Sequence, residues 1–176
     1  MERSTCREAV RDLAPVCNGF QAQLRALITA NPTLLGCGNY YVAATEPGDL
    51  VGCGGWTPEK PGTGEIIEGE GHIRHFATHS QWIRHGIGSA LLGRCISDSR
   101  SIGVRKLRCL TTPSAEHFYR AAGFNTVGPI DVQVGSSLAF PAVSMICKIA
   151  YRNYLPTLAL TDRWKSRSSR KVSLRY

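Results

Sequence analysis

The first thirty residues carry apolar side chains at alternating steps of three and four, which is the spacing of one face of an α-helix. These positions are Val10, Leu13, Cys17, Phe20, Leu24 and Leu27. Pro15 interrupts the pattern, and Asn31-Pro32 ends it because a residue before proline avoids the helical conformation. The chain is therefore expected to begin with two short helices or one kinked helix.

Three segments rich in strand-forming residues follow. Residues 39–45 and 50–56 flank Glu46–Asp49, a cluster of turn residues, and predict a β-hairpin. Residues 57–69 are rich in Pro, Gly and Glu, which is typical of a loop. A third strand is predicted over 71–78. Its alternation places Ile73, His75 and Ala77 on one face, and His72, Arg74, Phe76 and Thr78 on the other.

Beyond this strand the pattern alternates helix with strand. A helix opens after the glycine-containing turn at 84–88 and ends before Gly103. Its apolar positions are Ile87, Leu91, Cys95 and Ile102. A strand is expected at 106–111, a short helix at 115–122, and a final pair of strands at 130–134 and 142–149, around Phe140-Pro141. The order predicts an α/β (α+β) domain with a mixed, partly antiparallel central sheet flanked by helices.

Composition narrows the class of protein. The 176 residues suffice for one ordinary domain, and 43% hydrophobic residues exclude a wholly disordered chain. No apolar run approaches the roughly 20 residues of a membrane helix, and the first residues have no apolar signal core. The seven cysteines form no C-x-x-C pair, so we expect reduced thiols and a cytoplasmic location.

The net charge of +8 is concentrated at the end of the chain. Residues 150–176 contain seven Lys and Arg against one Asp, whereas residues 1–149 are nearly neutral. We therefore predict a domain at 1–149 and a basic tail at 150–176. A basic tail can contact nucleic acid, but no groove-reading motif accompanies it, and basic chain ends are commonly solvated. Nucleic-acid association is thus an alternative of low weight.

The segment Arg84-His85-Gly86-Ile87-Gly88-Ser89-Ala90 joins a predicted strand to a predicted helix. A helix N-terminus offers free backbone N–H groups and a positive dipole end, and glycines allow an anion to approach. A P-loop needs Lys after the second glycine, and the dinucleotide fingerprint needs Gly at position 91, which is Leu. The segment is therefore either a phosphate site of another kind or simply a tight turn.

A second segment about thirty residues later, Ser114 to Phe124, contains Tyr119 on a short predicted helix. Tyr119 could be an ordinary half-buried aromatic residue. It could also donate a proton to a leaving group, because a phenol with a pKa near 10 is protonated at neutral pH.

Taken together, residues 72–124 resemble the GNAT superfamily of acetyl-CoA-dependent N-acetyltransferases. The family turn reads Gln/Arg-x-x-Gly-x-Gly/Ala, and residues 83–88 match its glycines while Ile83 replaces Gln/Arg. The stretch FATHSQW resembles the family's strand end, and AEHFYRAAGF resembles its last-helix motif, with Ser114 where Asn is usual. GNAT domains usually begin with a strand, which is expected to be missing here because the chain begins in a helix.

The resemblance implies a set of site residues. Acetyl-CoA would bind through Phe76, Thr78, Arg84, His85, Gly86, Ile87, Gly88, Ser89, Ala90 and Ser114, and Tyr119 would be the general acid. The acetyl group would pass to a primary amine of a small molecule or peptide by direct attack in a ternary complex. Glu70, His72 and His75 are candidate bases, with Glu70 preferred, although Glu70 could also belong to a solvated acidic loop.

Two further expectations concern ligands. Alternation separates His72 from His75 in a strand, so we expect no metal. Glu65, Glu68 and Glu70 would favour a cationic acceptor if they line the cleft. A non-catalytic GNAT-like binding module is the first alternative to an enzyme, because Ile83, Ser114 and the missing strand depart from the family pattern. No membrane partner is expected.

Overall fold

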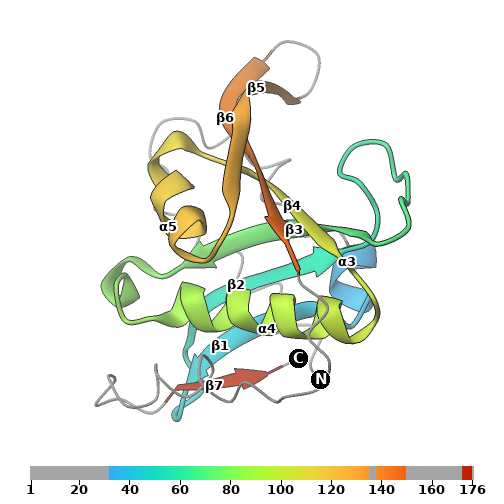
Figure 1. The fold of residues 1–176 in the computed structure, drawn as a ribbon. Coiled ribbons are helices and arrows are strands. Elements are labelled where there is room, and N and C mark those ends of the chain that lie inside the picture. The colour runs from blue at the N-terminus through green and yellow to red at the C-terminus, as the bar shows by residue number, and fades with distance from the viewer. Residues whose placement is uncertain (1–31, 135–137, 150–171, 176) are drawn as a thin grey trace.

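The computed structural model describes residues 32–134, 138–149 and 172–175, and the helices predicted over residues 10–27 lie outside these ranges. The elements, in chain order, are α3 (Pro32–Gly36), β1 (Tyr40–Thr45), β2 (Leu50–Thr57), β3 (Glu70–Thr78), the 3-10 helix η2 (Ser80–Trp82), α4 (Ile87–Ser101), β4 (Lys106–Thr111), the 3-10 helix η3 (Pro113–Ala115), α5 (Glu116–Ala121), β5 (Asn125–Val134), β6 (Leu138–Lys148) and β7 (Val172–Arg175). The described strands form one sheet in the order β5-β6-β4-β3-β2-β1-β7 (Figure 1). Because β3 and β4 are parallel and the other neighbours antiparallel, the predicted fold class is confirmed.

Two apolar clusters lie on opposite faces of the sheet. Tyr41 belongs to a large cluster that includes Leu91 of α4 and Tyr119 of α5. The adjacent Tyr40 belongs to a smaller cluster with Leu34 of α3. Because neighbouring strand residues point to opposite faces, α4 and α5 cover one face and α3 the other.

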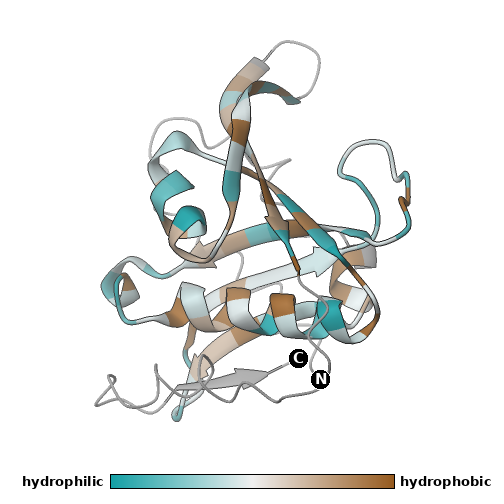
Figure 2. Cartoon of the chain, in the orientation of Figure 1, coloured by the Kyte–Doolittle hydropathy of each residue, from teal (hydrophilic) through white to brown (hydrophobic). Residues whose placement is uncertain are grey.

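Helix α4 packs on the sheet, and its buried side chains belong to the main core. Figure 2 shows apolar and polar residues alternating along the helix. Ile87, Leu91 and Cys95 are buried, as predicted. Ile102 is 67% exposed, contrary to the prediction, because the helix ends at Ser101. Gly103, whose φ is 87°, then turns the chain toward β4.

Strands β3 and β4 are paired along only part of their length. The ladder joins Glu70, Gly71 and His72 to Lys106, Leu107 and Arg108 and stops there. Beyond this point β3 stays with β2 and β4 stays with β6. Figure 1 shows the two strands diverging toward the side on which α4 begins. The sheet therefore contains a V-shaped opening whose closed end is at His72.

A bulge changes the expected alternation along β3. Cys53 pairs with Ala77 and Gly55 with Arg74, so β3 has one more residue than β2 between these pairs. His75 lies in this bulge with φ of 45°. As a result Phe76 packs on the main core together with Ile73, and Ala77 packs on the smaller cluster, which corrects the predicted faces of these two residues.

The last strands also differ from prediction. Phe140 and Pro141, which the prediction left outside the strand at 142–149, lie within β6, which pairs with β5 from Ile146 to Leu138. Proline is accepted there because β4 pairs with β6 only from Val143 onward, so Pro141 has a neighbouring strand on one side alone.

The predicted basic tail contributes a strand to the sheet. Residues Val172–Arg175 form β7, which pairs antiparallel with β1. The sequence had placed these four residues in the tail. β7 thus occupies the sheet edge beside β1. The predicted boundary near residue 149 is otherwise untested, since residues 150–171 lie outside the described ranges. No helix in the described part of the chain is long and apolar enough to cross a membrane.

Candidate active site

The N-terminus of α4 presents unpaired backbone amides. Gly86 caps the helix in the left-handed conformation, with φ of 82°, and no side chain bonds to the cap. The first helical bond joins the Ala90 N–H to the Gly86 carbonyl at 2.9 Å. The N–H groups of Ile87, Gly88 and Ser89 therefore have no acceptor within the helix. Together with the helix dipole, they form a surface suited to an anion.

The space beside this turn is bounded by β3 and α5. A Cβ atom on Gly88 would lie 3.3 Å from the Phe118 ring and 3.8 Å from Thr78 Oγ1. Glycine at this position therefore lets the first turn of α4 lie close to Phe118 and to the end of β3. The predicted residues Gly86, Gly88 and Thr78 are thus brought together.

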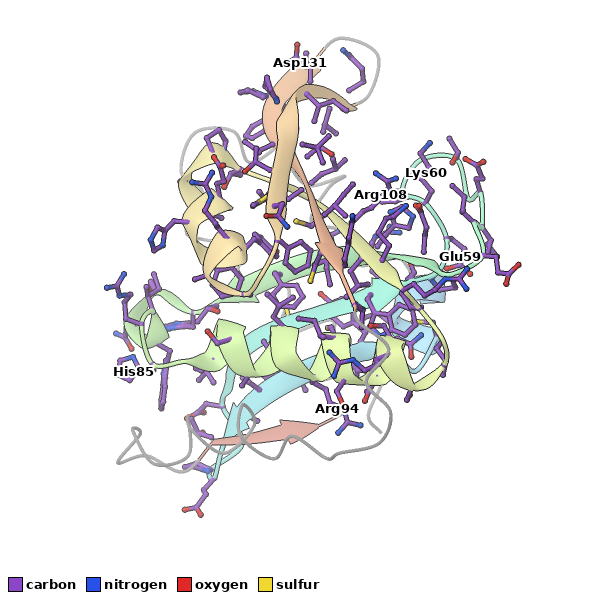
Figure 3. The ribbon with its side chains drawn as sticks, in the orientation of Figure 1. Glu59, Lys60, His85, Arg94, Arg108 and Asp131 are labelled. Carbon is purple, nitrogen blue, oxygen red and sulfur yellow. The ribbon has the colours of Figure 1, made fainter. Side chains whose placement is uncertain are left out.

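The polar side chains before Gly86 lie on the outside of the turn. Arg84 is exposed and adopts a φ of 70°, which is uncommon for a side chain of its size. His85 is also exposed, with Nδ1 3.0 Å from the Ile83 carbonyl and its ring 5.6 Å from Trp82 (Figure 3). Both remain available to an anion at the turn. Ser114 is exposed in η3, with its hydroxyl 3.0 Å from that of Thr112.

Two glycines of β2 leave room for aromatic rings beside the bulge of β3. A Cβ on Gly55 would lie 2.6 Å from the Tyr40 ring, and one on Gly54 would lie 2.6 Å from the Phe76 ring. Each glycine thus admits one aromatic ring, on opposite faces of β2. The Tyr40 hydroxyl donates to the His75 carbonyl at 3.1 Å and ties the bulge to β1. Tyr40 was not among the residues predicted from the sequence, although the Gly54-Gly55 pair indicates close packing.

Tyr119 lies beneath the V-shaped opening. Its ring centroid is 6.3 Å from that of Phe76 on β3, 4.9 Å from Phe118 and 5.5 Å from Phe124. Burial raises the pKa of its hydroxyl, so the phenol stays protonated at neutral pH. None of the described residues forms a hydrogen bond with this hydroxyl. The residue is therefore both the buried aromatic and the protonated phenol that the sequence left as alternatives.

Glu70 is held in ion pairs at the closed end of the opening. Its carboxylate accepts hydrogen bonds from Lys106 and from Arg108, whose Nε lies 2.7 Å from Oε2. These bonds, led by that from Arg108, lower the pKa of Glu70 to about 2. A carboxylate with so little affinity for a proton is a poor general base near neutral pH. The arrangement argues against the preferred role of Glu70, and also against its placement in a solvated loop.

His72, another of the candidate bases, is buried and neutral. It is only 6% exposed, and its Nε2 is buried without a hydrogen-bond partner among the described residues. Burial lowers the pKa of the imidazole, so His72 is neutral near pH 7, and Nε2 carries an unused lone pair when the ring proton is on Nδ1. His75, by contrast, is exposed in the bulge.

The family comparison bears on this arrangement. The family model described as "Acetyltransferase (GNAT) domain" matches residues 36–126, which is more than half of the chain. The chain belongs to the GNAT acetyltransferase family. None of the curated proteins compared with this GNAT chain matches it.

Solved structures share the fold at low sequence identity. A GNAT-family acetyltransferase from Staphylococcus aureus Mu50 is 16% identical, with 85% of this chain and 96% of that chain covered and a TM-score of 0.64. A phosphinothricin acetyltransferase from Sinorhizobium meliloti, solved with acetyl-CoA, is 19% identical, with 89% and 86% covered and a TM-score of 0.56. A Mycobacterium tuberculosis protein solved with CoA is 16% identical, with 84% and 96% covered and a TM-score of 0.56. These likenesses support the GNAT fold.

The residues present fit the phosphate groups of acetyl-CoA. The amides at the start of α4 are free of side-chain caps, and Gly88 has no side chain to cover them. In the described ranges, no three His, Cys, Asp or Glu side chains gather as a metal ligand set.

Proposed function

We propose that this GNAT-family chain transfers the acetyl group of acetyl-CoA to a primary amine of a small molecule or peptide. The observation that carries the proposal is the group of uncapped amides at the start of α4, which lies beside Thr78 at the end of β3, where β3 has diverged from β4. Tyr119 packs on Phe76 of the same strand. Acetyl-CoA supplies the thioester. The amine nitrogen bonds to the carbonyl carbon, the carbon–sulfur bond breaks, and no covalent enzyme intermediate is needed.

The anchoring role falls to the turn and the end of β3. The amides of Ile87, Gly88 and Ser89, with the cap residue Gly86 and the exposed Arg84 and His85, are the proposed pyrophosphate ligands. The amide of Ala90, which was predicted with them, is already bonded to the Gly86 carbonyl at 2.9 Å. Backbone groups of Phe76 and Thr78, and the Ser114 hydroxyl, are proposed further contacts. A backbone N–H near Thr78 is the proposed group that polarises the carbonyl oxygen.

Two side chains are proposed to move protons. His72 Nε2 takes the proton of the attacking amine, because it is neutral, buried and unpaired. Tyr119 donates a proton to the departing sulfur, because its phenol is protonated and lies against β3 at the opening. Glu70 is not assigned to proton transfer. The cytoplasmic location remains a prediction.

The test is the Tyr119→Phe variant, which keeps the ring that packs on Phe76, Phe118 and Phe124. We expect acetyl-CoA to bind with unchanged affinity while turnover falls at least about 100-fold, the lower range for loss of a general acid. Turnover is followed by release of the CoA thiol, and binding by titration calorimetry. Unchanged turnover would remove the assigned role, and binding of acetyl-CoA without turnover in the unmodified protein would favour the non-catalytic alternative.

A further inference from the structure

A group of charged side chains surrounds His72 on the face of the sheet opposite α4. Ile73 packs on the main core under α4, so its neighbours His72 and Arg74 point to the other face. The ladders place Thr57 of β2 and Arg108 of β4 on either side of His72. We call these four residues, His72, Arg74, Thr57 and Arg108, the His72 cluster.

The guanidinium of Arg74, in the His72 cluster, has no ion-pair partner among the described residues. Its Nη1 donates to Thr57 Oγ1 at 3.2 Å, and Thr57 is the ladder partner of His72, so the guanidinium lies beside the imidazole. No described carboxylate forms an ion pair with Arg74, and Glu59 acts on it only at longer range. A guanidinium has five N–H donors. Most of those of Arg74 are left for a ligand.

The opposite side of His72 is also positive. Arg108 donates to Glu70 at 2.7 Å, and Lys106 bonds to the same carboxylate, so one negative charge is shared by two cations. Lys60 adds a positive charge that acts on His72, and it is paired with Glu65 at 3.6 Å. Of the four charges that act on His72, only that of Glu70 is negative. The surroundings of His72 therefore carry an excess of positive charge.

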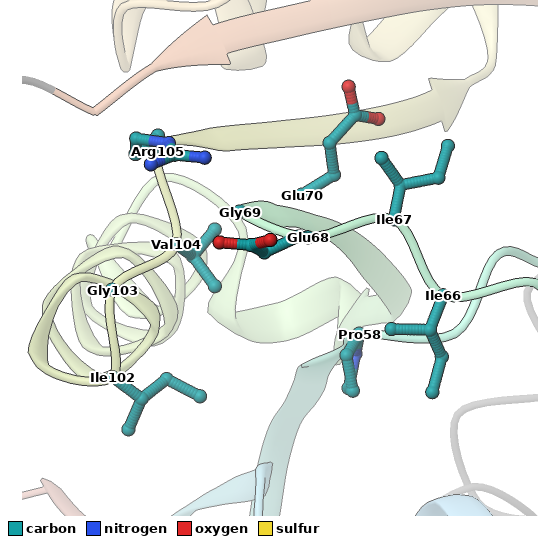
Figure 4. Close-up of a pocket in the computed structure, with 10 residues that line it drawn as sticks. All are labelled: Pro58, Ile66, Ile67, Glu68, Gly69, Glu70, Ile102, Gly103, Val104 and Arg105. Carbon is teal, nitrogen blue, oxygen red and sulfur yellow. The ribbon is translucent and has the colours of Figure 1, made fainter.

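Two of the three Glu residues expected to select a cationic acceptor are held in ion pairs. Glu65 is paired with Lys60 and Glu70 with Lys106 and Arg108. Glu68 lines a cavity of about 310 Å³ that Glu70 and Ile102 also line, at the C-terminal end of α4 and away from the glycine turn (Figure 4). The expectation of a cationic acceptor is therefore not supported.

We propose that the acceptor is an amine that also carries a carboxylate, which Arg74 binds while the amine nitrogen lies at His72 Nε2. This inference rests on the proposed acetyl transfer. Arg binds a carboxylate through two parallel hydrogen bonds, which would fix the orientation of the amine. The proton lost from the amine passes to Nε2 and then to water.

The test compares matched pairs of acceptors: each of the common α-amino acids, and β-alanine, against its carboxamide, at saturating acetyl-CoA. CoA thiol release gives the rate, and mass spectrometry identifies the product. We expect at least one acid to exceed its carboxamide by 10-fold or more in kcat/KM, mainly through KM. Arg74→Gln should abolish that difference by raising KM for the acid, and Arg74→Lys should restore part of it. Arg100→Gln, at an exposed position on α4, is the matched control and should leave it unchanged.

The outcomes separate the two proposals. Equal rates for acids and carboxamides would overturn the carboxylate inference while the acetyl transfer stood. A protein that binds acetyl-CoA but acetylates none of the acids would also overturn it. A protein that binds no acetyl-CoA would overturn the proposed function itself. If Arg74→Gln fails to fold, judged by its thermal midpoint, the comparison in the unmodified protein still decides.

Discussion

At the residue scale, two titratable groups on one strand face are kept in opposite states. Glu70 and His72 are two positions apart on β3. Two cations keep Glu70 ionised, while burial keeps His72 neutral. The sequence could name both residues as candidates but could not rank them. The cations that decide the matter, Lys106 and Arg108, are 36 and 38 positions away in the chain.

We predict that Glu70→Gln destabilises the protein by about 2 kcal/mol at pH 7, the usual size of a lost charged hydrogen bond. The folded pKa is lowered from 4.5 to about 2, so the stabilisation is fully present above pH 4.5 and is lost as the pH falls toward 2. Urea unfolding at pH 7 and pH 3 should show the difference between unmodified and variant protein shrinking with acidification.

Glu68→Gln is the control for this prediction, since Glu68 is exposed on the preceding loop. It should change the free energy of unfolding by no more than about 0.5 kcal/mol. A Glu70→Gln protein as stable as the unmodified one at pH 7 would show that the ion pairs contribute nothing.

At the element scale, the order of strands and helices from Tyr40 to Ala121 was predictable, but the bulge was not. The hairpin, β3, α4 and β4 follow from periodicity and turn residues, and the structure confirms them. The bulge at His75 depends on Tyr40 reaching across β2 at Gly55, which is a tertiary contact. The alternation of side chains along β3 therefore could not predict the bulge at His75.

Two glycines in α4 allow a matched prediction. Gly88→Ala brings a Cβ to 3.3 Å from the Phe118 ring and 3.8 Å from Thr78 Oγ1, beside the amides proposed to bind the pyrophosphate, so we expect acetyl-CoA affinity to fall about 10-fold, or about 1.4 kcal/mol. Gly93→Ala has nothing within 4 Å and should stabilise the helix by about 1 kcal/mol with unchanged affinity. Titration calorimetry measures both affinities. Equal affinity in the two variants would mean that the ligand does not approach Gly88.

At the scale of the whole molecule, a C-terminal strand lies at the sheet edge next to β1. The sequence predicted that a first strand of the family is missing, and an exposed edge would follow from its absence. β7 instead pairs with β1 over Val42 to Thr45. The sequence did not indicate this pairing, because a four-residue strand in a basic segment has no strong periodicity.

We predict that a chain ending at Lys171 loses this pairing and unfolds at a lower temperature. Loss of the backbone bonds to β1 should cost roughly 2 kcal/mol, or several degrees in the thermal midpoint. A chain that ends at Arg175 keeps β7 and serves as the control. If both chains melt at the midpoint of the full protein, β7 contributes no stability.

The central claim, that this GNAT-family chain uses acetyl-CoA, is tested most directly by its thermal midpoint with and without that compound. A ligand at 100 times its dissociation constant stabilises the folded state by about 2.7 kcal/mol, which corresponds to an increase of about 5–10 °C for a domain of this size. We predict this increase with acetyl-CoA and none with NAD or ATP. An unchanged midpoint in a cooperatively folded protein would contradict the claim and leave the Gly86–Gly88 segment as a turn without a ligand.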